Sequence, residues 1–323
     1  MHLLSFSLIE PEDKFYLYYP SWLNVGESHL YKLALKATNA HGWGFKRFGA
    51  SREEYSREMI RAPLYKNYLD AMDQAADNAL QQLNAKERML LMKSRTAFIY
   101  ADAWGETGPF EDVTSPLHSA IMDTLPKNLV KKFAIKDFTC KVRGEEHAFM
   151  QAMRLAQDYL DWRLYDFVVI CAAYRAVPCL VFSQQAMNGR SKNKQTHLNI
   201  SVERVGCFVF SQREASLGIQ CGKMLTAPQG APLEQVISGL DPQQDWLALA
   251  SLKKDAAFEK QLADAAGSIR HINLVDMYGE SGPVTPALSL IFQQRQRYQA
   301  GKVRTLLKDV FGGYIWFDSW SMH

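Results

Sequence analysis

The hydrophobic pattern of this chain switches repeatedly between the two-residue period of strands and the three-to-four-residue period of helices. In chain order, the pattern predicts strands at residues 3–9, 95–101, 132–142, 167–173, 205–211, 215–220, 245–251, 272–277, 303–310 and 314–320. It predicts helices at residues 65–83, 149–160, 253–266 and 287–298. Strands and helices alternate twice over, which indicates an α/β protein built from two similar halves.

The expected halves divide within the polar segment 183–197, which gives domains 1–190 and 191–323. In the first domain, the segment of about 10–63 shows no clear period and combines aromatic with charged side chains, so we interpret it as an insertion. The segment DAWGETGP (102–109) resembles DMYGESGP in the second half, and each follows an expected strand. This short repeat is a weak indication of duplication.

The middle of the expected insertion interleaves aromatic and basic side chains: Trp43, Phe45 and Phe48 alternate with Lys46 and Arg47. Such a mixture can mark a nucleic-acid surface. The net charge of the 323 residues is only +3, however, and 22% charged with 47% hydrophobic residues is typical of a globular protein. We therefore expect no nucleic-acid partner, and we expect these aromatic side chains to be exposed or half-exposed anchors for a protein partner.

The cysteine and histidine patterns give no sign of a metal or cofactor site. The five cysteines are Cys140, Cys171, Cys179, Cys207 and Cys221. Most lie in or beside apolar, strand-like runs, so we expect reduced core residues of a cytoplasmic protein. The histidines are scattered and no phosphate-binding glycine loop is present, so we expect no cofactor and no metal. The N-terminus lacks a basic leader segment, and the longest strongly apolar run, Phe167–Ala173, is too short to span a membrane.

The most specific motifs lie in the last fifty residues. They are Tyr278-Gly279, Ser281, Pro286-Ala287, Gly301-Lys302-Val303, Gly312-Gly313 and Trp316. Their order resembles the C-terminal end of the β-ketoacyl-acyl carrier protein synthases, especially the type III branch of the thiolase superfamily. Residues 71–83, 144–156 and 166–172 resemble earlier elements of that family more loosely. The resemblance implies a thiolase-like five-layer α-β-α-β-α fold with two similar halves.

The resemblance also places three catalytic positions at strand-to-helix turns. Condensing enzymes of this type use a Cys at a helix N-terminus, where the helix dipole lowers the thiol pKa. A His and an Asn stabilise the enolate that forms during the reaction. In this chain the Cys position falls on Glu146, the His position on Ala250 and the Asn position on Glu280. The sequence thus resembles that of the family, but this chain lacks the family's nucleophile, its proton shuttle and its oxyanion donor.

Neighbouring residues do not restore these functions. Cys140 lies six residues before the Cys position, within an expected strand, and His271 precedes a strand where the family's His follows one. A carboxylate near a developing enolate would repel it. Glu146 is either a favourable charge in a first helical turn or, with His147 beside it, a base in a recast site.

The resemblance and the altered positions together favour a non-catalytic ketosynthase-like subunit, comparable to a chain length factor. Such a subunit pairs with an active condensing enzyme in fatty-acid, polyketide or related secondary-metabolite biosynthesis. The expected partners are a ketosynthase-like chain, an acyl carrier protein, or both, and a homodimer is the competing assembly. Thiolase-fold proteins pair through a sheet edge. Two clusters of basic side chains could attract an acidic carrier protein, and the alternative is that they are ordinary solvated surface. The first cluster is Lys127, Lys131 and Lys132, and the second is Arg295, Arg297, Lys302 and Arg304.

Two other classes of function remain open at this point. The chain is alternatively a divergent acyltransferase, decarboxylase or hydrolase that acts on acyl thioesters with a site around Glu146, His147 and Glu280. A closed apolar pocket joining the two glutamates would favour that hypothesis. The third possibility is a module that binds an acyl chain or another small molecule without turnover.

Overall fold

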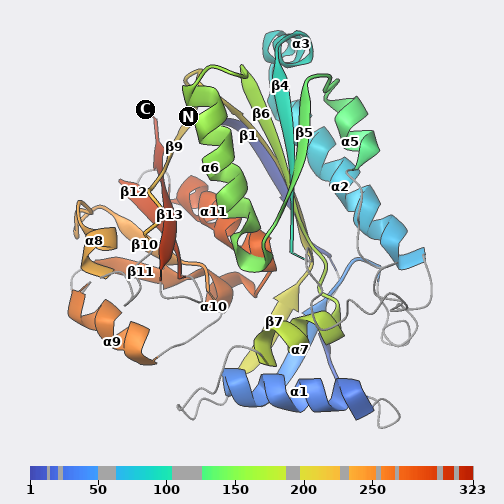
Figure 1. Cartoon of the computed structure of the whole chain (residues 1–323), viewed down its shortest axis with the longest axis vertical. Coiled ribbons are helices and arrows are strands. Elements are labelled where there is room, and N and C mark those ends of the chain that lie inside the picture. The colour runs from blue at the N-terminus through green and yellow to red at the C-terminus, as the bar shows by residue number, and fades with distance from the viewer. Residues whose placement is uncertain are drawn as a thin grey trace.

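The structure is a computed structural model. It describes residues 1–12, 15–20, 25–49, 63–103, 126–186, 197–225, 233–251, 256–265, 269–296, 301–308 and 313–322. Ten strands of this part of the chain form one large sheet in the order β11-β10-β12-β13-β9-β1-β8-β6-β4-β5, and three more form a small sheet (Figure 1).

The first half of the large sheet contains five strands. They are β1 (His2–Ile9), β4 (Thr96–Asp102), β5 (Phe138–Arg143), β6 (Phe167–Tyr174) and β8 (Arg204–Ser211). Strand β4 pairs in parallel with β5 and β6, whereas β8 is antiparallel to both β6 and β1. Every residue of β4, β6 and β8 is buried. These strands are continuous apolar runs because helices cover both of their faces.

The second half repeats this arrangement. Its strands are β9 (Leu217–Cys221), β10 (Trp246–Leu249), β11 (Arg270–Asn273), β12 (Lys302–Lys308) and β13 (Tyr314–Ser321). Strand β10 pairs in parallel with β11 and β12, whereas β13 is antiparallel to both β12 and β9. Counted within each half, the strands follow the same spatial order with the same directions. The two similar halves predicted from the alternating pattern are therefore present.

The halves meet where β1 pairs with β9, at His2 with Gly218 and Leu3 with Leu217. Strand β8 completes the first set of five strands, and β9 begins the second. The sheet order thus favours a division at residues 212–216, and the domain boundary at residue 190 stays a prediction.

Helices form three layers around the two halves of the sheet (Figure 1). The outer helices of the first half are α2 (Pro63–Gln82), α3 (Ala85–Lys93) and α5 (Lys127–Lys132). The central helices are α6 (Ala148–Asp161) and α11 (Leu288–Arg295). The outer helices of the second half are α8 (Leu233–Ile237) and α9 (Ala256–Ala265). Three clusters of buried apolar side chains fill the spaces between these layers. The predicted five-layer α-β-α-β-α arrangement is thereby confirmed.

The segment predicted to be an irregular insertion contains regular structure. Its elements are β2 (Tyr16–Leu17), α1 (Val25–Thr38) and β3 (Gly42–Lys46). With β7 (Leu198–Val202) they form the small sheet, in the order β2-β3-β7, and α1 packs against α7 (Pro178–Ala186). The prediction of an irregular segment was wrong because β2 is very short and β3 carries two glycines, which obscure the strand period.

The aromatic side chains of this segment are core residues. Trp43 and Phe45 are 1% and 0% exposed, and their rings lie 5.5 and 5.7 Å from the Phe182 ring of α7. The prediction that they are exposed anchors was wrong, and only Phe48 is half-buried. Arg47 is also buried, in an ion pair with Glu203 at 3.0 Å. These residues therefore hold the small sheet against the body of the protein.

Two segments that were predicted to be strands each contain part of a helix and part of a strand. The segment 132–142 begins at the end of α5, and only its last residues lie in β5. The segment 272–277 begins in β11 and continues as α10 (Leu274–Tyr278), because the Asn273 side chain accepts hydrogen bonds from the backbone of the first helical turn. Residues 104–109 of the short repeat and Gly312 lie outside the described residues. No helix in the described ranges is long and apolar enough to cross a membrane.

Candidate functional site

Two short 3-10 helices meet where the central helices begin. One is η2 (Glu145–His147), which leads into α6, and the other is η3 (Gly282–Ala287), which leads into α11. Glu146 lies within η2, and Glu280 precedes η3 by two residues. Ala250 is buried directly after β10. Glu146 and Ala250 thus lie between a strand and a helix, whereas Glu280 lies between the short helix α10 and η3, so the prediction of a strand-to-helix turn was wrong for Glu280. The contact of η2 with η3 brings the two glutamate segments together.

The Glu280 carboxylate is buried and accepts three hydrogen bonds from the protein. Its Oε2 accepts from the Tyr174 hydroxyl and from Ser201 Oγ, each at 2.9 Å. Its Oε1 accepts from the Gly282 backbone N–H at 2.8 Å. The donors come from the end of β6, from β7 and from the start of η3. Glu280 therefore connects three elements that are far apart in the sequence.

Burial controls the protonation of this cluster. Removal from water raises the pKa of Glu280 above its usual value, and the hydrogen bonds from Ser201, Tyr174 and Gly282 only partly oppose that shift. Burial also raises the pKa of the Tyr174 phenol well above its usual value, and the nearby charge of Glu280 raises it further. Glu146 adds to the shift at Tyr174, so its carboxylate lies within electrostatic range of the same cluster.

The turn that carries Glu280 is fixed by its own backbone and by Arg204. Glu280 N–H donates to the Ile200 carbonyl, and Val202 N–H donates to the Glu280 carbonyl, each at 2.8 Å. Arg204 Nη1 donates to Ser281 Oγ at 2.6 Å, and its guanidinium also pairs with Glu10 at 2.7 Å. A turn held on both sides in this way keeps the carboxylate directed at Tyr174 and Ser201.

Close packing also fixes Gly282, which has a φ of +49°. A Cβ atom at this position would lie 2.5 Å from the Tyr174 ring. Only glycine permits both the left-handed backbone and this close approach. The packed Tyr174 ring thus occupies the space in front of the η3 start.

His147 and the five cysteines are the candidates to replace the missing catalytic groups. His147 ends η2 and is half-buried, and Cys140 lies within β5, as its position in an apolar run indicated. Burial raises the pKa of the Cys140 thiol to about 11 and those of Cys179, Cys207 and Cys221 to about 12. Burial likewise raises the pKa of Cys171 well above its usual value. None of the five cysteines therefore resembles an activated thiolate, which requires a lowered pKa.

Three residues of the basic clusters noted in the sequence, Lys132, Lys302 and Arg304, form ion pairs in the described structure. Lys132 Nζ lies 2.7 Å from an oxygen of Asp77. Arg304 is buried and makes two hydrogen bonds to the Asp318 carboxylate, at 2.6 and 2.7 Å. Arg297 lies outside the described residues. Arg304 therefore belongs to a buried ion pair, and the charge of Lys132 is balanced by Asp77 at the surface.

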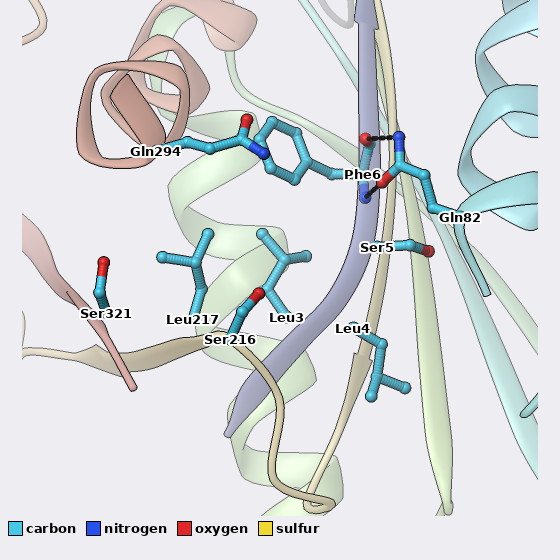
Figure 2. Close-up of a pocket in the computed structure, with 9 residues that line it drawn as sticks. All are labelled: Leu3, Leu4, Ser5, Phe6, Gln82, Ser216, Leu217, Gln294 and Ser321. Atoms are coloured by element: carbon cyan, nitrogen blue, oxygen red, sulfur yellow. Dashed lines mark hydrogen bonds between the residues drawn. The ribbon is translucent and has the colours of Figure 1, made fainter. Parts of the chain in front are cut away.

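A pocket of about 70 Å³ lies away from this cluster, between the ends of β1, β9 and β13 (Figure 2). None of Glu146, Ala250 and Glu280 lines it. In the described ranges, no three His, Cys, Asp or Glu side chains gather closely enough to hold a metal ion.

Sequence reasoning missed the residues that surround Glu280, namely Tyr174, Ser201 and Arg204. The available signal was their polarity within apolar strand patterns, as in the segment SVER at 201–204. Buried polar side chains almost always have hydrogen-bond partners, but the sequence does not show which partners they find.

Comparison with known proteins supports the fold. No protein-family model and no curated protein sequence matches the chain. Solved structures match over nearly the whole chain. A variant of OleA from Xanthomonas campestris is 11% identical with a TM-score of 0.60, and the match covers 99% of this chain and 97% of that one. The complex AntDE:AntF, a type II PKS acyl-carrier protein in complex with its ketosynthase, is 10% identical with a TM-score of 0.61, and the match covers 99% of each chain.

A third similar structure is the 3-oxoacyl-(acyl carrier protein) synthase III, FabH, of Pseudomonas aeruginosa PAO1. It is 10% identical with a TM-score of 0.55, and the match covers 100% of this chain and 98% of that one. This chain therefore has the fold of the thiolase-like condensing enzymes, as the resemblance of its C-terminal motifs predicted. At such low identity the likeness concerns the fold, and function must be argued from the site.

Proposed function

We propose that this chain is a non-catalytic ketosynthase-like subunit that pairs with an active condensing enzyme of fatty-acid, polyketide or related biosynthesis. The observation that carries the proposal is the burial and hydrogen bonding of the Glu280 side chain. In the position where the resemblance expects a catalytic Asn, its carboxylate is buried and bonded to Tyr174, Ser201 and Gly282. Both oxygens of the carboxylate accept hydrogen bonds from the protein, so this position serves to hold the fold together.

The nucleophile position supports the same proposal. Glu146 stands at the start of α6, where the resemblance expects a thiolate. A carboxylate there gains from the helix dipole without any catalytic role. The high pKa values of all five thiols leave no cysteine suited to replace the missing nucleophile.

No specific observation favours the hypothesis that this chain is an enzyme. A divergent acyltransferase or decarboxylase around Glu146, His147 and Glu280 needs a carboxylate that can reach a substrate or exchange a proton with it. Glu280 instead is buried, and its carboxylate accepts hydrogen bonds from the Tyr174 hydroxyl and from the Gly282 N–H of η3. A module that binds an acyl chain or another small molecule without turnover also finds no specific support. The homodimer remains the competing assembly, and a cytoplasmic location stays a prediction.

We place the partner at the β5 end of the large sheet. Among the described strands, β5 is the last in that direction, so the backbone groups of its outer edge suit pairing with another strand. Beside it, the rings of Phe138, Tyr159 and Tyr165 lie 5.4 to 6.0 Å apart and are half-buried. Trp162 and Leu164 are 68% and 46% exposed. Aromatic side chains of this kind dominate the binding energy of protein interfaces.

Co-expression tests this proposal. We expect the chain to elute as a heterodimer when it is co-expressed with the Cys-bearing condensing enzyme encoded beside it, as measured by size-exclusion chromatography with light scattering. The double variant W162E and L164E should weaken the complex because it adds charge to the apolar surface beside β5. The matched control is M224E, because Met224 is 54% exposed in the second half. A stable homodimer that ignores every ketosynthase encoded nearby would contradict the partner proposal.

A further inference from the structure

The two halves of the large sheet separate soon after they meet. Strand β1 pairs with β9 at His2 and Leu3, and within the described residues this pairing does not continue to Ser5. The pairing of β1 with β8 is irregular between Leu3 and Ser5, as in a β-bulge. We call this place the fork and define it by residues 3–6 of β1 with Ser216 and Leu217 at the start of β9.

A pocket of about 70 Å³ lies in the fork. Its lining residues are Leu3, Leu4, Ser5, Phe6, Gln82, Ser216, Leu217, Gln294 and Ser321. Figure 2 shows Phe6, Leu3 and Leu217 on one side of β1, and Gln82 with Ser5 on the other. The volume is well above the roughly 10–15 Å³ that one water molecule requires. The lining has apolar walls, hydroxyls and carboxamides, and it includes no ionisable side chain.

Gln82 occupies the position of a strand partner at the fork. Its Nε2 donates to the Phe6 carbonyl at 2.8 Å, and its Oε1 accepts from the Phe6 N–H at 3.2 Å (Figure 2). A neighbouring antiparallel strand would satisfy both groups with the N–H and C=O of one residue, which point to the same side of that strand. The carboxamide at the end of α2 therefore takes the place of one residue of a neighbouring strand on β1. Gln82 is exposed, so it can leave this position without disturbing the core.

Two polar atoms near the pocket have no hydrogen-bond partner in the described part of the chain. One is the hydroxyl of Ser5, which lines the pocket and is buried. The other is Oε1 of the buried Gln293, whose Nε2 donates to Ser321 Oγ at the pocket rim. Buried groups of this kind normally have a partner, so the fork has unused capacity for hydrogen bonds.

We propose that the fork binds an extended, uncharged peptide segment of another polypeptide, and that the backbone N–H and C=O of one of its residues replace the Gln82 carboxamide on Phe6. Extended peptides add to free strand edges through backbone hydrogen bonds, and a pocket beside the edge selects the side chain. The pocket size restricts that side chain to a small one, and the lining favours an apolar or neutral one. This contact is separate from the β5 end of the sheet, so it does not depend on the function proposed above.

The experiment uses the full chain and a fluorescein-labelled peptide, acetyl-Thr-Val-Ala-Val-Thr-amide, with fluorescence anisotropy as the readout. The variant Q82A removes the competing carboxamide and should bind the peptide about fivefold more tightly than the unmodified chain, the equivalent of ~1 kcal/mol for one such interaction. The variant S216W places a large ring at the pocket rim and should abolish binding. The control M224W, at an exposed position away from the fork, should bind like the unmodified chain.

A second peptide, with Pro in place of its central Ala, cannot donate the central backbone hydrogen bond and should bind at least tenfold more weakly. Circular dichroism of each variant verifies that the fold is retained. Failure of the Q82A variant to bind the first peptide at millimolar concentration would show that Gln82 only protects the edge of β1. Binding that is unaffected by S216W would equally overturn the proposal.

Discussion

The Tyr174 hydroxyl donates a hydrogen bond to Glu280 Oε2 at 2.9 Å, and both side chains are buried. Tyr174 ends β6 of the first half, whereas Glu280 precedes the central helix of the second. The bond thus joins the two halves at the place where the resemblance expects catalysis. A glutamate fixed in this way joins the two halves of the fold, and that structural role is the basis of the proposal that this chain is non-catalytic.

Substitution of Glu280 should reveal this structural role. The E280A change leaves the Gly282 N–H and one of the Tyr174 and Ser201 hydroxyls without an acceptor, because these hydroxyls lie 2.9 Å apart and only one can donate to the other. An unsatisfied buried group costs about 1–3 kcal/mol. We expect E280A to lower the free energy of unfolding by about 3 kcal/mol. The E280Q change keeps the size and one carbonyl oxygen, so its loss should be below about 1 kcal/mol. Urea denaturation measures both, and equal losses would contradict the hydrogen-bond account.

The raised pKa of Glu280 predicts a pH dependence of stability. The folded state holds the proton of this acid to a higher pH than the unfolded state, whose carboxyl ionises near 4.5. The unfolded state therefore binds fewer protons as the pH rises from about 4.5 toward the raised pKa, and stability falls over that window. The stability of the unmodified chain relative to E280Q should thus decrease from pH 5 to pH 8. Urea denaturation at both pH values checks this, and a rising difference would contradict the raised pKa.

The turn after α5 offers a test of backbone strain. Ala134 has a φ of +51°, and the Ile135 N–H donates to the Val130 carbonyl, a pattern that normally places glycine at this position. The A134G change should raise the free energy of unfolding by about 0.5–1 kcal/mol. The control A85G changes an exposed residue at the start of α3 and should lower it. If urea denaturation shows no gain in the free energy of unfolding for A134G, the left-handed turn is not strained.

The assignment of Glu146 to the nucleophile position is testable with a new thiol. The E146C variant places a cysteine at the start of α6, where the helix dipole lowers a thiol pKa. It should react with iodoacetamide at pH 7 about tenfold faster than the exposed control M224C, consistent with a lower thiol pKa. The native cysteines should react slowly because burial raises their pKa values to about 11 or more. An E146C rate no higher than that of M224C would mean that the position is assigned wrongly.

The long, regular elements were predictable from sequence because many residues share one period. The strand at 3–9 and the helix at 149–160 each carry an uninterrupted pattern, and the structure confirms both. The small sheet escaped prediction because its strands are short and β3 pairs Trp43 and Phe45 with flexible glycines. Their burial arises from α7, whose position the local sequence does not indicate.

The site was predictable only in part. The resemblance located Glu146 between a strand and the start of a central helix, but it did not anticipate the short helix α10 that precedes Glu280. The hydrogen bonds around Glu280 come from Tyr174 and Ser201, which are 106 and 79 residues away in the chain. Such partners become neighbours only through the sheet order, so no local motif announces them.

Intact-protein mass spectrometry tests the central claim most directly. The purified chain is incubated with acyl-CoA or an acylated carrier protein, and an active condensing enzyme treated in parallel shows that the substrate can acylate a thiol. Because Glu146 replaces the nucleophile and burial raises the pKa values of all five thiols, the account predicts no change in mass. An acyl adduct on Glu146 or on any cysteine would contradict the proposal that this subunit is non-catalytic.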